Sequence, residues 1–140
     1  MSKEAKRVGI PDVWDQSDFP MAQAVVEPDG RRVHLTGQVG WGADFNVIGK
    51  GDAEKQAHAA IDNIEAVLAG IGGSLEDIVS FTTYYTRQVD LPGIYRARED
   101  RFHRDSGPAV TGIRVAGLVD PDLLVEFAVI AVIPEKRYTG

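Results

Sequence analysis

The sequence contains no cysteine, which excludes a disulfide framework, a thiolate zinc site and a cysteine nucleophile. Basic residues are fewer than acidic ones, 15 against 21, so the net charge is −6 at pH 7. Because such a chain is repelled by a phosphate backbone, nucleic-acid binding is disfavoured. No uncharged apolar run is long enough to span a bilayer, and the N-terminus lacks an apolar signal-peptide core. We therefore expect a cytoplasmic protein with no membrane partner.

Length and composition are typical of one globular domain. The chain has 140 residues, of which 44% are hydrophobic and 26% are charged, and this is enough for a single core but not for two. Residues 1–18 are polar and broken by Pro11, so we interpret them as an N-terminal arm. The domain then covers residues 19–140.

Apolar and β-branched runs predict the strands. Runs at 22–26 and 32–36 flank Glu27-Pro28-Asp29-Gly30, a tight-turn sequence, and together they predict a β-hairpin. Further strands are expected at 78–86, 109–116 and 123–133.

Two helices separate these strands. The first begins after Asp52, carries an apolar stripe at spacings of four, three and four residues, and ends at Gly72-Gly73. The second runs from Pro92 to about His103. The predicted fold class is α+β, with both helices covering one face of the sheet.

The last apolar run, Leu123–Ile133, is interrupted only by Glu126. A run of this composition, bounded by Pro121 and Pro134, is typical of a strand buried on both faces. A buried carboxylate is costly unless it finds a cation or hydrogen-bond donors. Glu126 is therefore either an acid in a pocket or subunit interface, or a structural glutamate tied to an arginine or placed at a strand end or edge.

Other candidate segments carry weaker signals. The glycine-rich segment 37–42 is not followed at once by a helix, so we interpret it as a bulged strand end where backbone approaches a ligand or a neighbouring chain. His34, His58 and His103 show no metal-ligand spacing, so we expect no metal site.

Arginines are dense in the second helix and in the strand that follows it. Arg96, Arg98, Arg101 and Arg104 alternate with acidic residues, which predicts a solvated charged face. Arg114 lies between two apolar residues in a strand, where its guanidinium needs a carboxylate from Glu126 or from a ligand.

Several short motifs follow one another in a recognisable order over about four-fifths of the chain. They are Thr36-Gly37-Gln38-Val39, Gln56, Asp62-Asn63, Leu68, Gly72, Glu76-Asp77-Ile78-Val79, Thr82-Thr83-Tyr84-Tyr85, Phe102, Pro108-Ala109, Val115-Ala116 with Leu118, and Glu126 ahead of Ile130-Ala131-Val132. In this order and spacing the chain resembles the Rid family of YjgF-like reactive-intermediate deaminases. The resemblance implies a chorismate-mutase-like α+β domain with a mixed β-sheet and two helices on one face. It also implies a homotrimer with small-molecule pockets between subunits.

The resemblance implies a function as well. Deaminases of this family hydrolyse 2-aminoacrylate and related enamines or imines to 2-keto acids and ammonia without a cofactor. Glu126 matches the family's glutamate, which helps to place the attacking water. The residues expected to surround the substrate are Gly37, Tyr95, Arg96, Val110, Thr111, Gly112 and Arg114. Tyr95 and Arg96 compete for one position on the second helix.

The chain departs from the family pattern where the substrate carboxylate should bind. The family's arginine directly follows Pro-Ala, and here Pro108-Ala109 is followed by Val110. Gly112 stands at the position where the family has a small residue or cysteine, and Met21 replaces a tyrosine. Loss of a charge-assisted contact of about 1.5–3 kcal/mol predicts a substrate other than 2-aminoacrylate.

Three functions are compatible with these residues. The favoured one is cofactor-free hydrolysis of an imine or enamine in an inter-subunit pocket around Glu126. The alternative is a non-catalytic small-molecule-binding or scaffold trimer. An endoribonuclease or translation inhibitor is disfavoured by the acidic charge and the lack of a basic groove.

Overall fold

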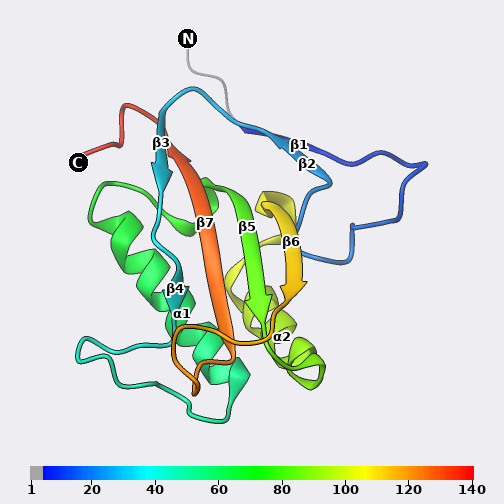
Figure 1. Ribbon diagram of the computed structural model, residues 1–140. Coiled ribbons are helices and arrows are strands. Elements are labelled where there is room, and N and C mark those ends of the chain that lie inside the picture. Colours follow the sequence, from blue (N-terminus) through cyan, green and yellow to red (C-terminus); the bar gives the residue numbers. More distant parts are fainter. Residues whose placement is uncertain (1–4) are drawn as a thin grey trace.

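A mixed β-sheet of five strands forms the centre of the computed structural model, which describes residues 5–140 (Figure 1). Along the sheet lie β3 (Arg31–His34), β7 (Val125–Ile133), β5 (Ile78–Tyr85) and β6 (Ala109–Arg114), with β4 (Gln38–Val39) also paired to β7. β5 and β6 are parallel, whereas β7 is antiparallel to each of its neighbours. Both helices, α1 (Ala53–Ala69) and α2 (Leu91–Arg101), lie on one face of this sheet. The predicted α+β architecture is confirmed.

The core fills the space between the sheet and the two helices. The predicted apolar stripe of α1 is fully buried and consists of Ala57, Ile61, Ile64 and Leu68. From the sheet, Phe81 and Phe127 are fully buried, with ring centroids 4.7 Å apart. Burial of one such side chain stabilises the fold by about 1.5–3 kcal/mol, so this aromatic pair holds β5 and β7 against the helices.

Both predicted ends of α1 are confirmed. The Asp52 carboxylate accepts a hydrogen bond from the Lys55 N–H at 3.1 Å, which caps the first turn. After the last turn, Gly72 has a φ of +89°, a conformation that side chains disfavour. The Gly73 N–H then donates to the Leu68 carbonyl at 2.8 Å and closes the helix.

The prediction that the last strand is buried on both faces is wrong within the protomer. One face of β7 is buried against the helices and carries Val125, Phe127, Val129 and Ala131. On the other face Glu126, Ala128 and Ile130 are only partly buried. Since both helices cover the first face, we call the second one the open face of the sheet.

The predicted β-hairpin is also wrong, because its two strands join different sheets. β2 (Ala24–Val26) pairs with β1 (Lys6–Val8), and β3 pairs with the end of β7. The nine-residue β7 offers β3 a long partner already packed on the core, whereas two short strands alone are marginally stable. Gly30, with a φ of +153°, packs so tightly on the Ile133 carbonyl that a Cβ would lie 2.5 Å from its oxygen.

The predicted N-terminal arm is partly structured. β1 and β2 form a separate two-stranded ribbon near the start of β6 (Figure 1), where Ala22 forms a parallel bridge to Ala109. Residues 1–4 of the arm lie outside the described residues.

The remaining elements are confirmed with shifted boundaries. Compared with the predicted boundaries, β5 ends one residue earlier, β6 ends two residues earlier and β7 begins two residues later. The helix α2 begins one residue earlier and ends two residues earlier than predicted. Short 3-10 turns connect them, namely η1 (Leu75–Asp77), η2 (Gln88–Asp90) and η3 (Arg104–Ser106). Within residues 5–140 no helix has the length and apolarity needed to cross a membrane; the cytoplasmic location stays a prediction.

Candidate functional site

Glu126 lies near the start of β7 on the open face of the sheet. It is registered with Tyr84 of β5 on one side and with Val39 of β4 on the other. Its side chain is partly buried, and its carboxylate forms no ion pair or hydrogen bond with any group in residues 5–140. Within the protomer, therefore, Glu126 is not tied to an arginine.

Gly37 lies directly against this carboxylate. A Cβ at position 37 would lie 3.0 Å from the Glu126 carboxyl carbon and would overlap Oε2. Only a residue without a side chain can lie here while the carboxylate keeps its position. The glycine-rich segment thus brings its backbone to the one carboxylate that the sequence singled out.

Side-chain alternation divides the other predicted site residues between the two faces of the sheet. Thr111 is registered with Thr82, which is registered with Ala128, so Thr111 shares the open face with Glu126. Two strand spacings and two residues of rise place it about 12 Å from Glu126. Val110 instead is registered with buried Phe81 and packs against the core.

Gly112 and Arg114 lie at register positions on the same face of the sheet as Val110. Gly112 is registered with buried Thr83, and a Cβ there would meet nothing within 4 Å. Arg114 ends β6, is registered with Tyr85 and is exposed. Because its register position is on the opposite face from Glu126, the two do not pair within the protomer, and that part of the prediction is wrong.

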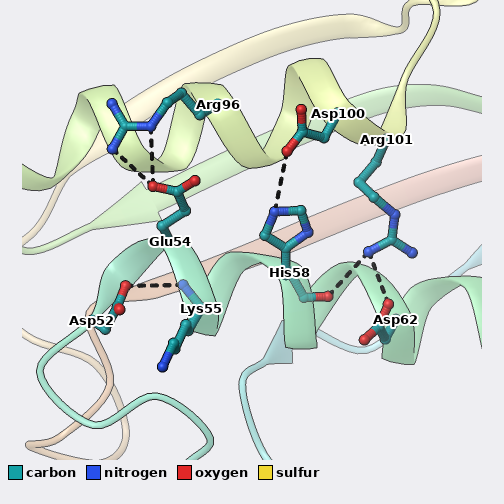
Figure 2. Close-up of polar contacts among 8 residues, drawn as sticks. All are labelled: Asp52, Glu54, Lys55, His58, Asp62, Arg96, Asp100 and Arg101. Carbon is teal, nitrogen blue, oxygen red and sulfur yellow. Dashed lines mark hydrogen bonds and ion pairs between the residues drawn. The ribbon is translucent and has the colours of Figure 1, made fainter.

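Ion pairs between the two helices occupy most of the arginines of α2 (Figure 2). Arg96 donates to Glu54 of α1 at 2.8 and 3.0 Å, and this hydrogen bonding raises the pKa of the Arg96 guanidinium. Arg101 lies 2.8 Å from Asp62 and also donates to the His58 carbonyl. Arg96, one of the two competing candidates, therefore serves helix packing and lies across the sheet from Glu126.

Arg98 does not belong to this charged face, contrary to the prediction. Only 4% of it is exposed, and burial lowers the pKa of its guanidinium. The guanidinium carbon lies 5.6 Å from the Phe81 ring centroid and 5.7 Å from that of Tyr95. The sequence held a signal for this position, because residue 98 follows the buried Ile94 by four residues, on the same side of the helix.

A hollow of about 360 Å³ lies at the other end of the open face. Its lining includes Arg32, His34, Ser80 and Ile130. Ile130 is four residues from Glu126 along β7, roughly 13 Å away, so this hollow and the Glu126 carboxylate are separate features of the same face.

Comparison with known proteins identifies the family of this chain. The model for the family described as endoribonuclease L-PSP matches residues 18–133. The chain belongs to this family, which is also known as the YjgF or Rid family. The family predicted from the motifs is thereby confirmed.

Individual Rid-family proteins resemble the chain over most of its length. A RutC family protein of Pyrococcus abyssi is 31% identical over 112 residues, covering 80% of this chain and 85% of the relative. The Rid-family protein YyfB from Yersinia pestis superposes with a TM-score of 0.84 at 24% identity, covering 94% of this chain and 100% of that one. RidA from an Antarctic Psychrobacter gives a TM-score of 0.68 at 24% identity, with coverages of 91% and 93%. At these identities the two structures show the fold.

Proposed function

We propose that this Rid-family chain forms a homotrimer in which the open face of the sheet is an interface and Glu126 lies in an inter-subunit pocket. The proposal rests on one observation above all, which is the partly buried Glu126 carboxylate, without a partner in residues 5–140, on a face no helix of the protomer covers. A strand whose second face is largely apolar, with Ala128 and Ile130 on the same face as that carboxylate, is suited to burial by another subunit.

The proposed reaction is the cofactor-free hydrolysis of an imine or enamine. An enamine first takes a proton on carbon and becomes an imine. Water then adds to the C=N carbon while the Glu126 carboxylate accepts a proton from that water. Return of this proton to nitrogen gives a carbinolamine. The hydroxyl proton of this carbinolamine then moves to nitrogen through the Glu126 carboxylate as the C–N bond breaks, which releases ammonia and leaves a carbonyl compound. Gly37, which has no side chain, lets this carboxylate lie directly against the backbone of the segment before β4.

The proposed substrate is not 2-aminoacrylate. Val110 packs against the core and offers no charge to a substrate carboxylate. A charge-assisted contact is worth about 1.5–3 kcal/mol, so its absence weakens binding by tenfold or more. We therefore expect little turnover of freshly generated 2-aminoacrylate.

A pair of matched variants tests the role of Glu126. Removal of a general base lowers a rate by about 10²–10⁴-fold, so Glu126→Gln should lower imine hydrolysis at least a hundredfold with an unchanged melting temperature. Glu135→Gln, at an exposed glutamate paired with Arg31, is the control and should retain full activity. Imines generated by an amino-acid oxidase provide the substrates, and the carbonyl product is measured.

Other outcomes would favour the alternatives. Equal activity in both variants would show that Glu126 takes no part in the reaction. Sedimentation as a monomer would refute the proposed subunit interface. A lowered melting temperature in Glu126→Gln, with no imine turned over by either protein, would favour a non-catalytic binding or scaffold protein. Salt-sensitive RNA binding would favour an endoribonuclease, which the net charge of −6 argues against.

A further inference from the structure

The side chains of β5, β6 and β7 that surround Glu126 on the open face contain no basic group. Cross-strand register gives the neighbours of this residue and the adjacent row two residues along the strands. They carry aromatic, aliphatic or hydroxyl groups and are Tyr84, Ile113, Ala128, Thr82 and Thr111. On these three strands, therefore, nothing next to the Glu126 carboxylate supplies a positive charge.

The basic residues of the sheet lie away from this carboxylate. His34 of β3 is registered with Ile130, which is four residues from Glu126 and roughly 13 Å away. Arg32 lies two residues further along β3 and donates hydrogen bonds to Glu27. Arg114 has its register position on the opposite face. The negative charge of Glu126 is therefore not neutralised by any ion pair within residues 5–140, and a bound ligand can use it.

Tyr84 adds an aromatic ring beside this carboxylate. Tyr84 and Glu126 are directly opposed on antiparallel strands, and both side chains are partly buried. The Cβ atoms of such a pair lie about 4.5–5.5 Å apart. The face of an aromatic ring attracts a cation that lies within about 6 Å of its centre. A carboxylate and an aromatic ring side by side are a combination that suits an organic cation.

We propose that the substrate bound at Glu126 is a protonated imine without a carboxylate, the iminium cation that forms when a primary amine is oxidised. This inference rests on the proposed function. A planar iminium donates its N–H groups to the carboxylate, as a guanidinium does. The carboxylate of an imino acid would instead bring a second negative charge toward Glu126 and repel it. Hydrolysis of the iminium consumes one water and releases a carbonyl compound and an ammonium ion, so atoms and charge balance.

The charge preference is tested with three stable probes of one shape on the unmodified protein. Benzamidine carries a planar amidinium, which resembles an iminium, whereas benzamide is neutral and benzoate is an anion. A charge-assisted hydrogen bond is worth about tenfold or more in affinity, so benzamidine should bind at least tenfold more tightly than benzamide in isothermal titration calorimetry. Benzoate should bind more weakly than either. Equal affinities, or no binding of benzamidine at about 10 mM, would overturn the proposal.

Variants then locate the binding. Glu126→Gln should lower benzamidine affinity about tenfold or more and leave benzamide affinity unchanged. Glu135→Gln, at the exposed glutamate paired with Arg31, is the control and should change neither affinity. Tyr84→Leu keeps an apolar side chain but removes the ring, and it should lower benzamidine affinity a few-fold. Full benzamidine affinity in both Glu126→Gln and Tyr84→Leu would place the cation elsewhere and refute the assignment.

Turnover separates this inference from the proposed function. A flavin amine oxidase converts benzylamine to benzaldimine, and an amino-acid oxidase converts phenylglycine to the same imine bearing a carboxylate. With ammonia release as the measure, kcat/KM should be at least about tenfold higher for the imine without the carboxylate. A preference for the imino acid, with its turnover lost in Glu126→Gln, would refute the substrate class and leave the proposed function intact. Benzamidine binding that depends on Glu126, without turnover of either imine, would overturn the proposed hydrolysis but support the cation site.

Discussion

The side chain of Gln56 joins three separate segments near Glu126, and its removal gives the sharpest stability prediction. Gln56 is fully buried on α1. Its Oε1 accepts from the Leu124 N–H at 2.8 Å, and its Nε2 donates to the carbonyls of Asp122 at 3.0 Å and of Gly49 at 3.2 Å. One amide therefore fixes the segment that enters β7 against the start of α1.

The expected loss follows from these three bonds. Gln56→Met keeps the side-chain volume but removes every donor and acceptor. The buried Leu124 N–H is then left without an acceptor, at a cost of about 1–3 kcal/mol, and each lost donor to a carbonyl adds about 0.5–1.5 kcal/mol. Together the free energy of unfolding should fall by about 2–6 kcal/mol, a large part of the usual 5–15 kcal/mol. The melting temperature should fall by roughly 10 °C.

Urea denaturation and calorimetry measure this loss. Val67→Ala, at an exposed position of the same helix, is the control and should change stability by less than about 0.5 kcal/mol. Gln56→Glu should be more destabilised at pH 8 than at pH 5, because a protonated carboxyl can donate to one carbonyl whereas a carboxylate cannot. A Gln56→Met protein as stable as its parent would refute the assignment of Gln56 as the tie between these segments.

Two further predictions concern the open face of the sheet. Gly37→Ala should displace the Glu126 carboxylate and lower imine hydrolysis by tenfold or more with little change in melting temperature; Gly117→Ala, where a Cβ meets nothing within 4 Å, should leave activity intact. The hydrogen bonds from Arg32 hold the pKa of Glu27 below its usual value, so this pair stabilises the fold above the ordinary carboxyl pKa, and that contribution is lost on acidification. Arg32→Ala should raise the pKa of Glu27 toward its usual value in an NMR titration. An unchanged pKa of Glu27 would contradict the pairing.

The helix predictions succeeded because their signals are local. Asp52 caps the N-terminus of α1, and Gly72, just after its C-terminus, has a positive φ, as their positions in the sequence predicted. The stripe ending at Leu68 follows from the helical period alone. Each of these features is decided by residues within four or five positions of one another.

The site was predictable in part. Glu126 stands out in the sequence because a charge interrupts an apolar run, and the structure places it beside Gly37 on a face that no helix of the protomer covers. Val110, Gly112 and Arg114 were grouped with it through the family resemblance, and within the protomer strand alternation places them on the other face. Arg98 was assigned to solvent because its neighbours in the sequence are charged, although the structure buries it.

The sequence by itself determined the two helices and the long strands β5, β6 and β7, how α1 is capped, and which family the chain belongs to. Only the tertiary structure decided that β3 pairs with β7 and not with β2, that Arg98 is buried, and that Glu126 pairs with no cation among residues 5–140. The reason is physical. Backbone preferences and side-chain period are set by neighbours along the chain, whereas strand partners and burial depend on which distant segments give the larger free energy when they meet.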